Sequence, residues 1–331
     1  MGQSDTSTAT YIDGKRVPDF FIVGHMKSGT TALYGALMRH PLVYMPRSKE
    51  PWFFADEVKL DAPPRPYGHG WTPRSLEEYL SLFEAAEPSQ RAGEASAIYL
   101  SSPTAARRIA EVQPAARIIA VIREPASFLR SLHLQFVQNY LETQHDFRKA
   151  LSLEKARRRG QKVQRNEYWP GATLYSDHVR YVEQLQRFEA AFPAAQIKVI
   201  IYDDFRSDNE AIVRDIWRFL DVDDTVPVKM REANPSVRVR SQRLLELTHA
   251  VAQGRGPATR AVNATARMLA PSQLTRESAM AIRDRLFFGS PKPPDEALML
   301  ELRRRFAGEV SALSEHLGRD LVSLWGYDRL G

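Results

Sequence analysis

Three short, almost wholly apolar runs constrain the fold of this chain most. They cover residues 19–24, 117–122 and 196–202, and each is followed by a segment whose apolar side chains recur at helical spacing. Runs that lack polar–apolar alternation are typical of strands buried on both faces, as in parallel sheets whose connections are helices. The pattern therefore predicts an α/β fold, a single domain with a central parallel sheet flanked by helices.

Three other stretches have no core pattern of their own. The segments near 58–73, 146–170 and 254–294 are rich in proline, glycine or basic residues, and we interpret them as loops or insertions. A chain of 331 residues is long enough for one large or two ordinary domains. We therefore expect an N-terminal extension over residues 1–18 and one domain over residues 19–326.

Composition excludes several kinds of chemistry. The chain has no cysteine, which rules out disulfides, thiolate metal sites and cysteine nucleophiles. Its apolar runs are far shorter than the roughly 20 residues that a membrane-spanning helix needs, so we expect no stable membrane insertion. The absence of a visible signal sequence predicts a cytoplasmic protein. The net charge of +6 fits nucleic acid, acidic lipid, a small anion or solubility alone.

A glycine-containing loop joins the first apolar run to the first predicted helix. Residues 24–31 read Gly-His-Met-Lys-Ser-Gly-Thr-Thr, and a loop between a strand and a helix N-terminus is a common phosphate-binding site. The loop matches the nucleoside-triphosphatase pattern at Gly24, Gly29 and Thr31. Thr30, however, occupies the lysine position of that pattern, and the lysine is instead Lys27. A lysine there would approach a group beside the 5′-phosphate without implying a metal.

A second pair of anion-binding candidates follows the run at 117–122. Arg123 closes this strand where a Mg²⁺-using fold would have an aspartate, and Ser131 lies about two helical turns further on. Taken alone, an arginine that closes a strand is more often the ion-pair partner of a residue such as Glu124. Together with the loop, it predicts two anion sites at one edge of a parallel sheet, and hence a nucleotide with two separated phosphates.

These residues resemble the PAPS-dependent sulfotransferase family, whose sulfuryl donor is 3′-phosphoadenosine 5′-phosphosulfate (PAPS). Residues 27–31 are similar to its 5′-phosphosulfate loop, and Arg123 with Ser131 to its 3′-phosphate motif. Residues 49–54, Lys-Glu-Pro-Trp-Phe-Phe, resemble a segment of the glycan-modifying branch in which the glutamate is the catalytic base. The resemblance implies a P-loop-kinase-like sulfotransferase fold, with adenosine 3′,5′-bisphosphate (PAP) as product and no metal.

The resemblance also implies roles for individual residues. Lys27 would be the cation at the leaving oxygen. Arg240 is a third candidate ligand for the 3′-phosphate, or equally one charge of a solvated arginine set. The complete donor-binding set is Lys27, Ser28, Gly29, Thr30, Thr31, Arg123, Ser131 and Arg240.

Glu50 is the residue that the resemblance implies as catalytic base. A glutamate with an ordinary pKa of about 4.3 is ionised at neutral pH and needs only correct placement. The alternative is that Glu50 pairs with Lys49 and points to water. Glu94, His25 and His133 are rival bases, although we interpret His133 as a helix-surface or supporting residue.

Two positions differ from the pattern of the glycan-modifying branch. Phe128 replaces an arginine and Ala95 a lysine, which weakens the expectation of a heparan-type substrate and leaves the donor prediction intact.

The acceptor is expected to be a sugar, alcohol or phenol hydroxyl. The main alternative is a P-loop kinase or nucleotide-binding protein that uses Mg-ATP. Nucleic acid is not expected as a partner, because no basic platform interleaved with aromatic residues is evident. The basic stretch at 146–165 is interpreted as a solvated helix face or as a lid.

Overall fold

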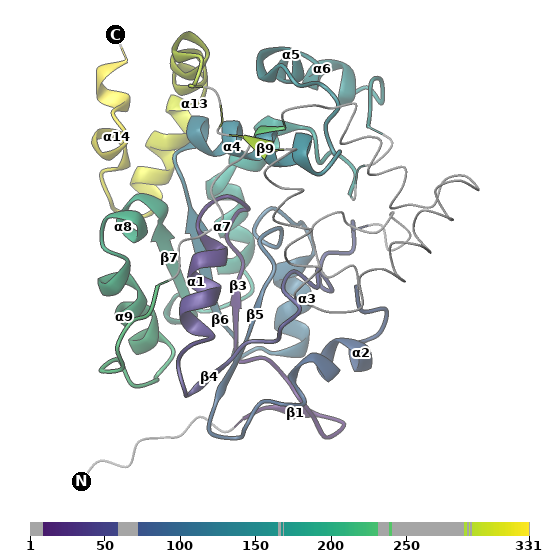
Figure 1. Cartoon of the computed structure of the whole chain (residues 1–331), viewed down its shortest axis with the longest axis vertical. Helices are drawn as coiled ribbons and strands as arrows, with labels where there is room; N and C mark the ends of the chain where they lie inside the picture. Colours follow the sequence, from purple (N-terminus) through teal and green to yellow (C-terminus); the bar gives the residue numbers. More distant parts are fainter. Residues whose placement is uncertain are drawn as a thin grey trace.

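A sheet of five parallel strands forms the centre of the molecule, in the order β4-β5-β3-β6-β7 (Figure 1). The computed structural model describes residues 9–58, 72–164, 167, 169–230, 238–239, 288–289, 291 and 293–330. The strands of the central sheet are β3 (Phe20–Ile22), β4 (Val43–Tyr44), β5 (Arg91–Ala95), β6 (Arg117–Ile122) and β7 (Ile197–Ile201). The predicted α/β class with a central parallel sheet is confirmed.

Helices connect and cover these strands. The α-helices are α1 (Thr30–Leu37), α2 (Leu76–Leu80), α3 (Ala105–Val112), α4 (Pro125–Gln138), α5 (Phe147–Ser152), α6 (Glu154–Arg157), α7 (Tyr181–Glu189), α8 (Tyr202–Ser207), α9 (Asn209–Phe219), α13 (Glu296–His316) and α14 (Leu321–Leu324). Short 3₁₀ helices are η1 (Ser81–Phe83), η2 (Tyr175–Val179), η3 (Ala194–Gln196) and η4 (Tyr327–Arg329). Two small antiparallel pairs complete the described structure, β1 (Tyr11–Ile12) with β2 (Lys15–Arg16) and β8 (Arg238–Val239) with β9 (Phe288–Gly289).

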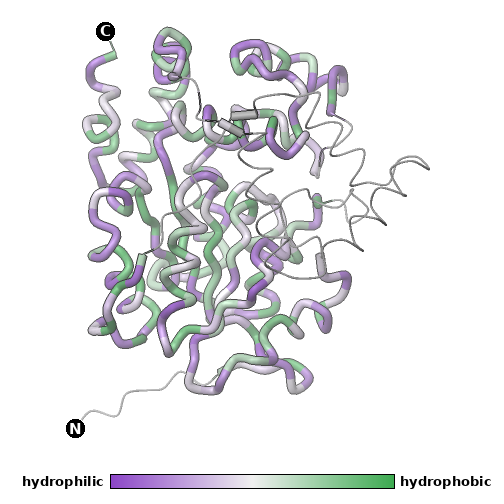
Figure 2. Tube along the Cα trace, viewed as in Figure 1, coloured by the Kyte–Doolittle hydropathy of each residue, from purple (hydrophilic) through white to green (hydrophobic). Residues whose placement is uncertain are grey.

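Both faces of the sheet are covered by helices, as the apolar runs predict. On β3, Phe20 and Ile22 pack in one cluster with α1 and α9, whereas Phe21 belongs to a second cluster with α3, α4, α7 and α13. Hydrophobic colour accordingly concentrates on the central strands and hydrophilic colour on the outer turns (Figure 2). Successive side chains of a strand point to opposite faces, so a strand buried on both sides must be apolar throughout.

Strand β3 lies in the middle of the sheet and determines where the site forms. It pairs with β5 on one side and with β6 on the other, so Phe21 lies opposite both Glu94 and Ile118. All five strands run in the same direction, and their carboxyl ends meet at one edge. In open parallel sheets, ligands bind at that edge, where the connections leave a central strand in opposite directions.

Strand β5 is an element that the apolar pattern does not predict. Its sequence, Arg-Ala-Gly-Glu-Ala, has no β-branched residue. The ring of Phe20 lies directly against Gly93, where a Cβ atom would come within 2.1 Å of the Phe20 ring. Gly93 therefore has no side chain because the Phe20 ring of the neighbouring strand occupies the adjoining space.

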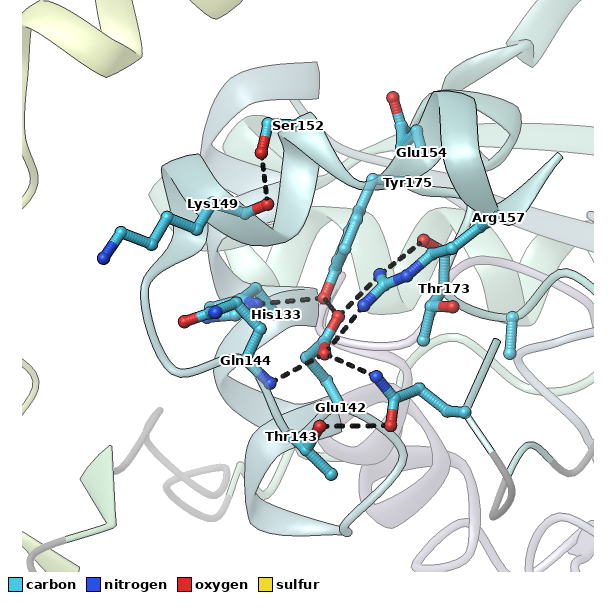
Figure 3. Close-up of polar contacts among 12 residues, drawn as sticks. His133, Glu142, Thr143, Gln144, Lys149, Ser152, Glu154, Arg157, Thr173 and Tyr175 are labelled. Carbon is cyan, nitrogen blue, oxygen red and sulfur yellow. Dashed lines mark hydrogen bonds and ion pairs between the residues drawn. The ribbon is translucent and has the colours of Figure 1, made fainter. Parts of the chain in front are cut away.

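The basic stretch after α4 folds into α5 and α6 on the outside of the molecule. Arg148 is half exposed and pairs with Asp295 and Glu301, and Arg158 pairs with Asp177, in agreement with a solvated face. Arg157 differs, because its side chain is only 1% exposed and holds Glu142 through two hydrogen bonds of 2.7 and 2.9 Å (Figure 3). One arginine of the stretch thus anchors it to the core.

Among the residues that the structure describes, no helix has both the length and the apolar character that crossing a bilayer would require. Most of the segments 58–73 and 254–294, interpreted above as insertions, lies outside the described residues.

Candidate active site

The carboxyl ends of four adjacent strands supply the candidate residues. The loop with Lys27 follows β3, residues 96–97 follow β5, Arg123 follows β6, and Tyr202 follows β7. Residues far apart in the sequence therefore meet at one edge of the sheet, as the two predicted anion motifs require.

The loop after β3 ends at the N-terminus of α1 in a backbone conformation suited to anion binding. Gly29 is the N-cap residue with a φ of 86°, and Lys27 has a φ of 63°. A Cβ atom at Gly29 would also come within 3.1 Å of the Tyr202 ring, so both conformation and space favour glycine. Thr30 is buried and Thr31 is exposed at the start of the helix. The first N–H groups of a helix lack intrahelical partners and are available to an anion.

Two side chains of this loop have unusual surroundings. Burial and, secondarily, the Arg123 guanidinium lower the pKa of the Lys27 amine. The Ser28 hydroxyl is buried and meets no hydrogen-bond partner among the described residues. A buried hydroxyl without a partner costs free energy that a bound anion would recover. The loop therefore fits a phosphate or sulfate group.

Arg123 joins the two predicted motifs directly. Its Nη1 donates to the Lys27 carbonyl oxygen at 2.9 Å and to the Ser131 hydroxyl at 3.2 Å, while Nε donates to the Ser127 hydroxyl at 3.2 Å. The guanidinium also lies over the Tyr202 ring, 4.8 Å from its centroid. Lys27, Arg123 and Ser131 thus lie together, as predicted, and Ser127 and Tyr202 are neighbours that the sequence reasoning missed.

Glu124 is not the hydrogen-bond partner of Arg123. Its carboxylate caps α4 by accepting from the N–H groups of Ala126 and Ser127, and it accepts from the Tyr327 hydroxyl at 2.7 Å. The C-terminal segment is thereby tied to the start of α4. The Arg123 fork is left facing the loop.

Glu50 lies in a strained turn beside the end of β5. It has a φ of 63°, and its backbone N–H donates to the Ala95 carbonyl at 3.0 Å. Its Oε2 accepts from the Ala97 N–H at 2.8 Å and from the Trp52 Nε1–H at 2.9 Å, and its Oε1 from Lys49 Nζ at 2.8 Å. Burial alone would raise the pKa of Glu50, but the Lys49 ammonium and these hydrogen bonds outweigh it, so the pKa lies below its ordinary value. Glu50 is therefore an ionised carboxylate held at two oxygens.

The Lys49–Glu50 pair exists, but it is only partly exposed. The two side chains are 16% and 21% exposed, and Lys49 Nζ lies 3.5 Å from the Thr30 hydroxyl and 3.4 Å from that of Thr31. From the sequence alone, Lys49 is expected only as a partner that would hold Glu50 in water. Because the two residues are adjacent in the sequence, their pairing can be predicted. The proximity of Lys49 to the phosphate loop cannot, because it depends on the turn at Glu50.

The rival bases are buried and occupied by other partners. Burial raises the pKa of Glu94 to about 8, against hydrogen bonds from Ser96, Tyr99 and Tyr79, so its carboxyl group is neutral at pH 7. Burial lowers the pKa of His25 to about 3, and its Nε2 lies 2.8 Å from the Gln184 side-chain oxygen.

His133 is likewise buried, so the helix-surface interpretation is wrong. Its Nδ1 lies 2.9 Å from the Tyr175 hydroxyl within the network around Glu142 (Figure 3), and burial lowers its pKa to about 4. Tyr175 is a fully buried member of the same network. Arg240, the third candidate ligand for the 3′-phosphate, lies outside the described residues.

Comparison with known proteins identifies the family. A family model described as "Sulfotransferase family" matches residues 18–226, more than half of the chain. This chain belongs to the sulfotransferase family. The family predicted from the phosphate loop and Arg123 is thus confirmed.

Individual relatives agree with this assignment. A solved sulfotransferase from Alicyclobacillus acidocaldarius is 25% identical with a TM-score of 0.64, and the match covers 93% of this chain and 98% of that one. The membrane-associated sulfotransferase kil1 of Dictyostelium discoideum is 32% identical over 123 residues, or 36% of this chain and 23% of that protein. The human bifunctional heparan sulfate N-deacetylase/N-sulfotransferase 3 is 27% identical over 214 residues, or 62% of this chain and 22% of that protein. The matches thus span less than a quarter of these two curated relatives.

Proposed function

We propose that this chain transfers a sulfuryl group from PAPS to an acceptor hydroxyl, with Glu50 as the catalytic base. The observation that carries the proposal is the position of the Arg123 guanidinium, which contacts both the Lys27 carbonyl and the Ser131 hydroxyl. One arginine thereby links a phosphate loop after β3 to a helix after β6, as a donor with both a 5′- and a 3′-phosphate requires.

The proposed donor site uses residues from both motifs. The Ser28 hydroxyl and the N–H groups at the start of α1, with Thr30 and Thr31, would hold the 5′-phosphate. Arg123 and Ser131 would hold the 3′-phosphate through charge-assisted hydrogen bonds. Arg240 stays a proposed third ligand.

The proposed reaction is an in-line displacement at sulfur. The acceptor oxygen forms a bond to sulfur while the bond from sulfur to the 5′-phosphate oxygen breaks, and that oxygen keeps the electron pair. Glu50 takes the proton of the acceptor hydroxyl, and its ionised state at neutral pH suits this role. The Lys27 ammonium stabilises the charge that develops on the leaving oxygen. No metal has a role in this mechanism.

The acceptor is proposed to be a small-molecule or carbohydrate hydroxyl, and the site of action to be the cytoplasm. The domain is proposed to comprise residues 19–326, with an N-terminal extension before it. These proposals follow from the family and from the predictions made on the sequence.

Ligand-dependent stability tests the donor assignment. Melting temperatures are compared for the chain alone, with PAP in EDTA, and with Mg-ATP. A ligand at 100 times its Kd stabilises the native state by about 2.7 kcal/mol, so PAP is expected to raise the melting temperature by several degrees without metal. Stabilisation by Mg-ATP and not by PAP would instead support the alternative of a P-loop kinase.

A further inference from the structure

Lys49 lies between the two halves of the proposed site. Its ammonium group is 2.8 Å from Glu50 Oε1, 3.5 Å from the Thr30 hydroxyl and 3.4 Å from the Thr31 hydroxyl. These hydroxyls begin α1, where the proposed 5′-phosphosulfate site lies, and Glu50 is the proposed base. In the proposed reaction, the sulfuryl group would be transferred between these two groups.

The three contacts of Lys49 are unequal. The contact with Glu50 has the ordinary length of a charged hydrogen bond, whereas those with the threonine hydroxyls are at the long end of the accepted range. An ammonium group has three N–H donors. Of the contacts made here, one is strong and two are weak, so an anion beside α1 would offer better acceptors than the hydroxyls do.

The charges favour the same arrangement. Lys49 is 16% exposed, so its attraction to a nearby anion is weakened by solvent less than that of a surface lysine. An ammonium between the Glu50 carboxylate and a bound anion would stabilise both. When Glu50 accepts the acceptor's proton, its negative charge disappears, and the Lys49 charge then acts on the transferring group alone.

We propose that Lys49 is a second donor-binding cation that contacts the sulfuryl end of the donor while it keeps Glu50 ionised. This inference rests on the proposed function. In it, Lys27 serves the leaving oxygen, and Lys49 donates hydrogen bonds to the non-bridging sulfuryl oxygens. The sulfuryl group moves from phosphate oxygen to acceptor oxygen, the proton moves to Glu50, and Lys49 keeps all its protons.

The product and the donor differ by the sulfuryl group, which allows a binding test that does not depend on turnover. The affinities of PAP and PAPS are measured calorimetrically, without acceptor and in EDTA, for the wild type, Lys49→Met and Lys49→Arg. A residue that contacts only the sulfuryl group must change PAPS binding and leave PAP binding unchanged. We expect Lys49→Met to bind PAPS about tenfold more weakly and PAP within about twofold of the wild type. Lys49→Arg is expected to recover part of the PAPS affinity.

Lys15→Met is a matched control. Lys15 lies on the β1–β2 hairpin, outside the site, and its ammonium group pairs with Glu84. It should leave both affinities unchanged. A pH–rate profile provides a second readout, since removing the Lys49 charge should move the acidic limb, governed by Glu50, to higher pH.

Three results would overturn the inference. Equal weakening of PAP and PAPS would assign Lys49 to the 5′-phosphate, and unchanged affinities for both would leave it a partner of Glu50 only. If the wild type bound no PAP at all, the proposed function itself would fail, and this inference with it.

Discussion

The candidate active site and the network around Glu142 use the same kinds of residue in opposite ways. In the network, the Glu142 carboxylate accepts hydrogen bonds from both Nη atoms of Arg157, from the Tyr175 hydroxyl, from the Gln164 side chain and from the Gln144 N–H (Figure 3). Its charge is matched by a buried arginine. Such a group has little capacity left for a ligand, and its role is to hold α5 and α6 against the core.

The candidate active site, in contrast, leaves capacity for a ligand. The Ser28 hydroxyl has no partner among the described residues, and Lys49 makes two long contacts. Of the seven non-glycine residues with positive φ in the described part of the chain, Lys27, Glu50 and Trp52 belong to this corner. Such conformations cost free energy and persist where the surrounding structure enforces them. The difference between the two regions is that a buried arginine matches the charge of Glu142, whereas the candidate site places an unpartnered hydroxyl at the start of a helix, where an anion can bind.

The largest expected effect is on turnover and comes from Glu50→Gln. The amide keeps the shape of the side chain but cannot accept the proton, so turnover should fall by about 10²- to 10⁴-fold. PAP affinity should stay within a few-fold of the wild type. PAP release from PAPS with an active hydroxyl acceptor measures the change, and Glu87→Gln, an exposed glutamate, is the control. Retained activity would show that the catalytic base is another residue.

The other side of the comparison is tested by Arg157→Met. Removing one partner leaves Glu142 buried without its counter-charge, which should lower the free energy of unfolding by about 3–5 kcal/mol. Arg158→Met is a matched control one residue away, because the Arg158–Asp177 pair is largely exposed and should contribute at most about 1 kcal/mol. Urea denaturation measures both. Equal losses for the two variants would remove the distinction between the buried and exposed arginines.

Lys27→Ala tests a residue of the candidate active site. Loss of the cation at the leaving oxygen should lower turnover by about 10²- to 10³-fold, by analogy with the removal of one oxyanion donor. Stability should hold or rise slightly, because burial disfavours the charged amine in the ligand-free protein. Single-turnover kinetics with PAPS measure the chemical step. Unchanged turnover would contradict the leaving-group role.

A further prediction concerns the pH dependence that Glu94 contributes to stability. Its pKa is raised to about 8 in the folded chain, from about 4.5 when unfolded, so the native state binds more protons between these values. The contribution of Glu94 to stability is therefore greatest below pH 4.5 and is lost as the pH rises to about 8, by at most about 1.4 kcal/mol per pH unit.

Glu94→Gln removes this titration. The stability of the variant relative to the wild type should rise steadily from pH 5 to pH 8 and then level off. Thermal melts at several pH values measure this difference. A difference that stays constant with pH would show that Glu94 is ionised in the folded chain.

The sequence predicts an element of the fold well where its local pattern fits only one kind of secondary structure. The run at 117–122 is apolar from Ile118 onward, and β6 has the bounds of the run. Strand β5 is not predicted, because Gly93 is small to accommodate the Phe20 ring of the neighbouring strand, a contact that no local pattern contains. Likewise, Arg157 belongs to a run of basic residues in the sequence, and nothing in that run distinguishes it from its neighbours. Its pairing with Glu142 is seen only in the tertiary structure.

The candidate site shows the same division. Loop spacing and the strand-ending position of Arg123 predict that Lys27 and Ser131 lie near each other. Nothing local predicts that Tyr202 lies under the Arg123 guanidinium, or that Lys49 reaches the threonines of α1, because both contacts depend on how distant segments approach the sheet edge.

The central claim is that the edge of the sheet binds a nucleotide with two separate phosphates. It is tested most directly by titrating the wild type and Arg123→Met with PAP and with adenosine 5′-phosphate, in EDTA. The account predicts that the wild type binds PAP about 10- to 100-fold more tightly than adenosine 5′-phosphate, and that Arg123→Met removes most of this difference. Equal affinity of the wild type for the two nucleotides, or a preference for PAP that survives Arg123→Met, would contradict it.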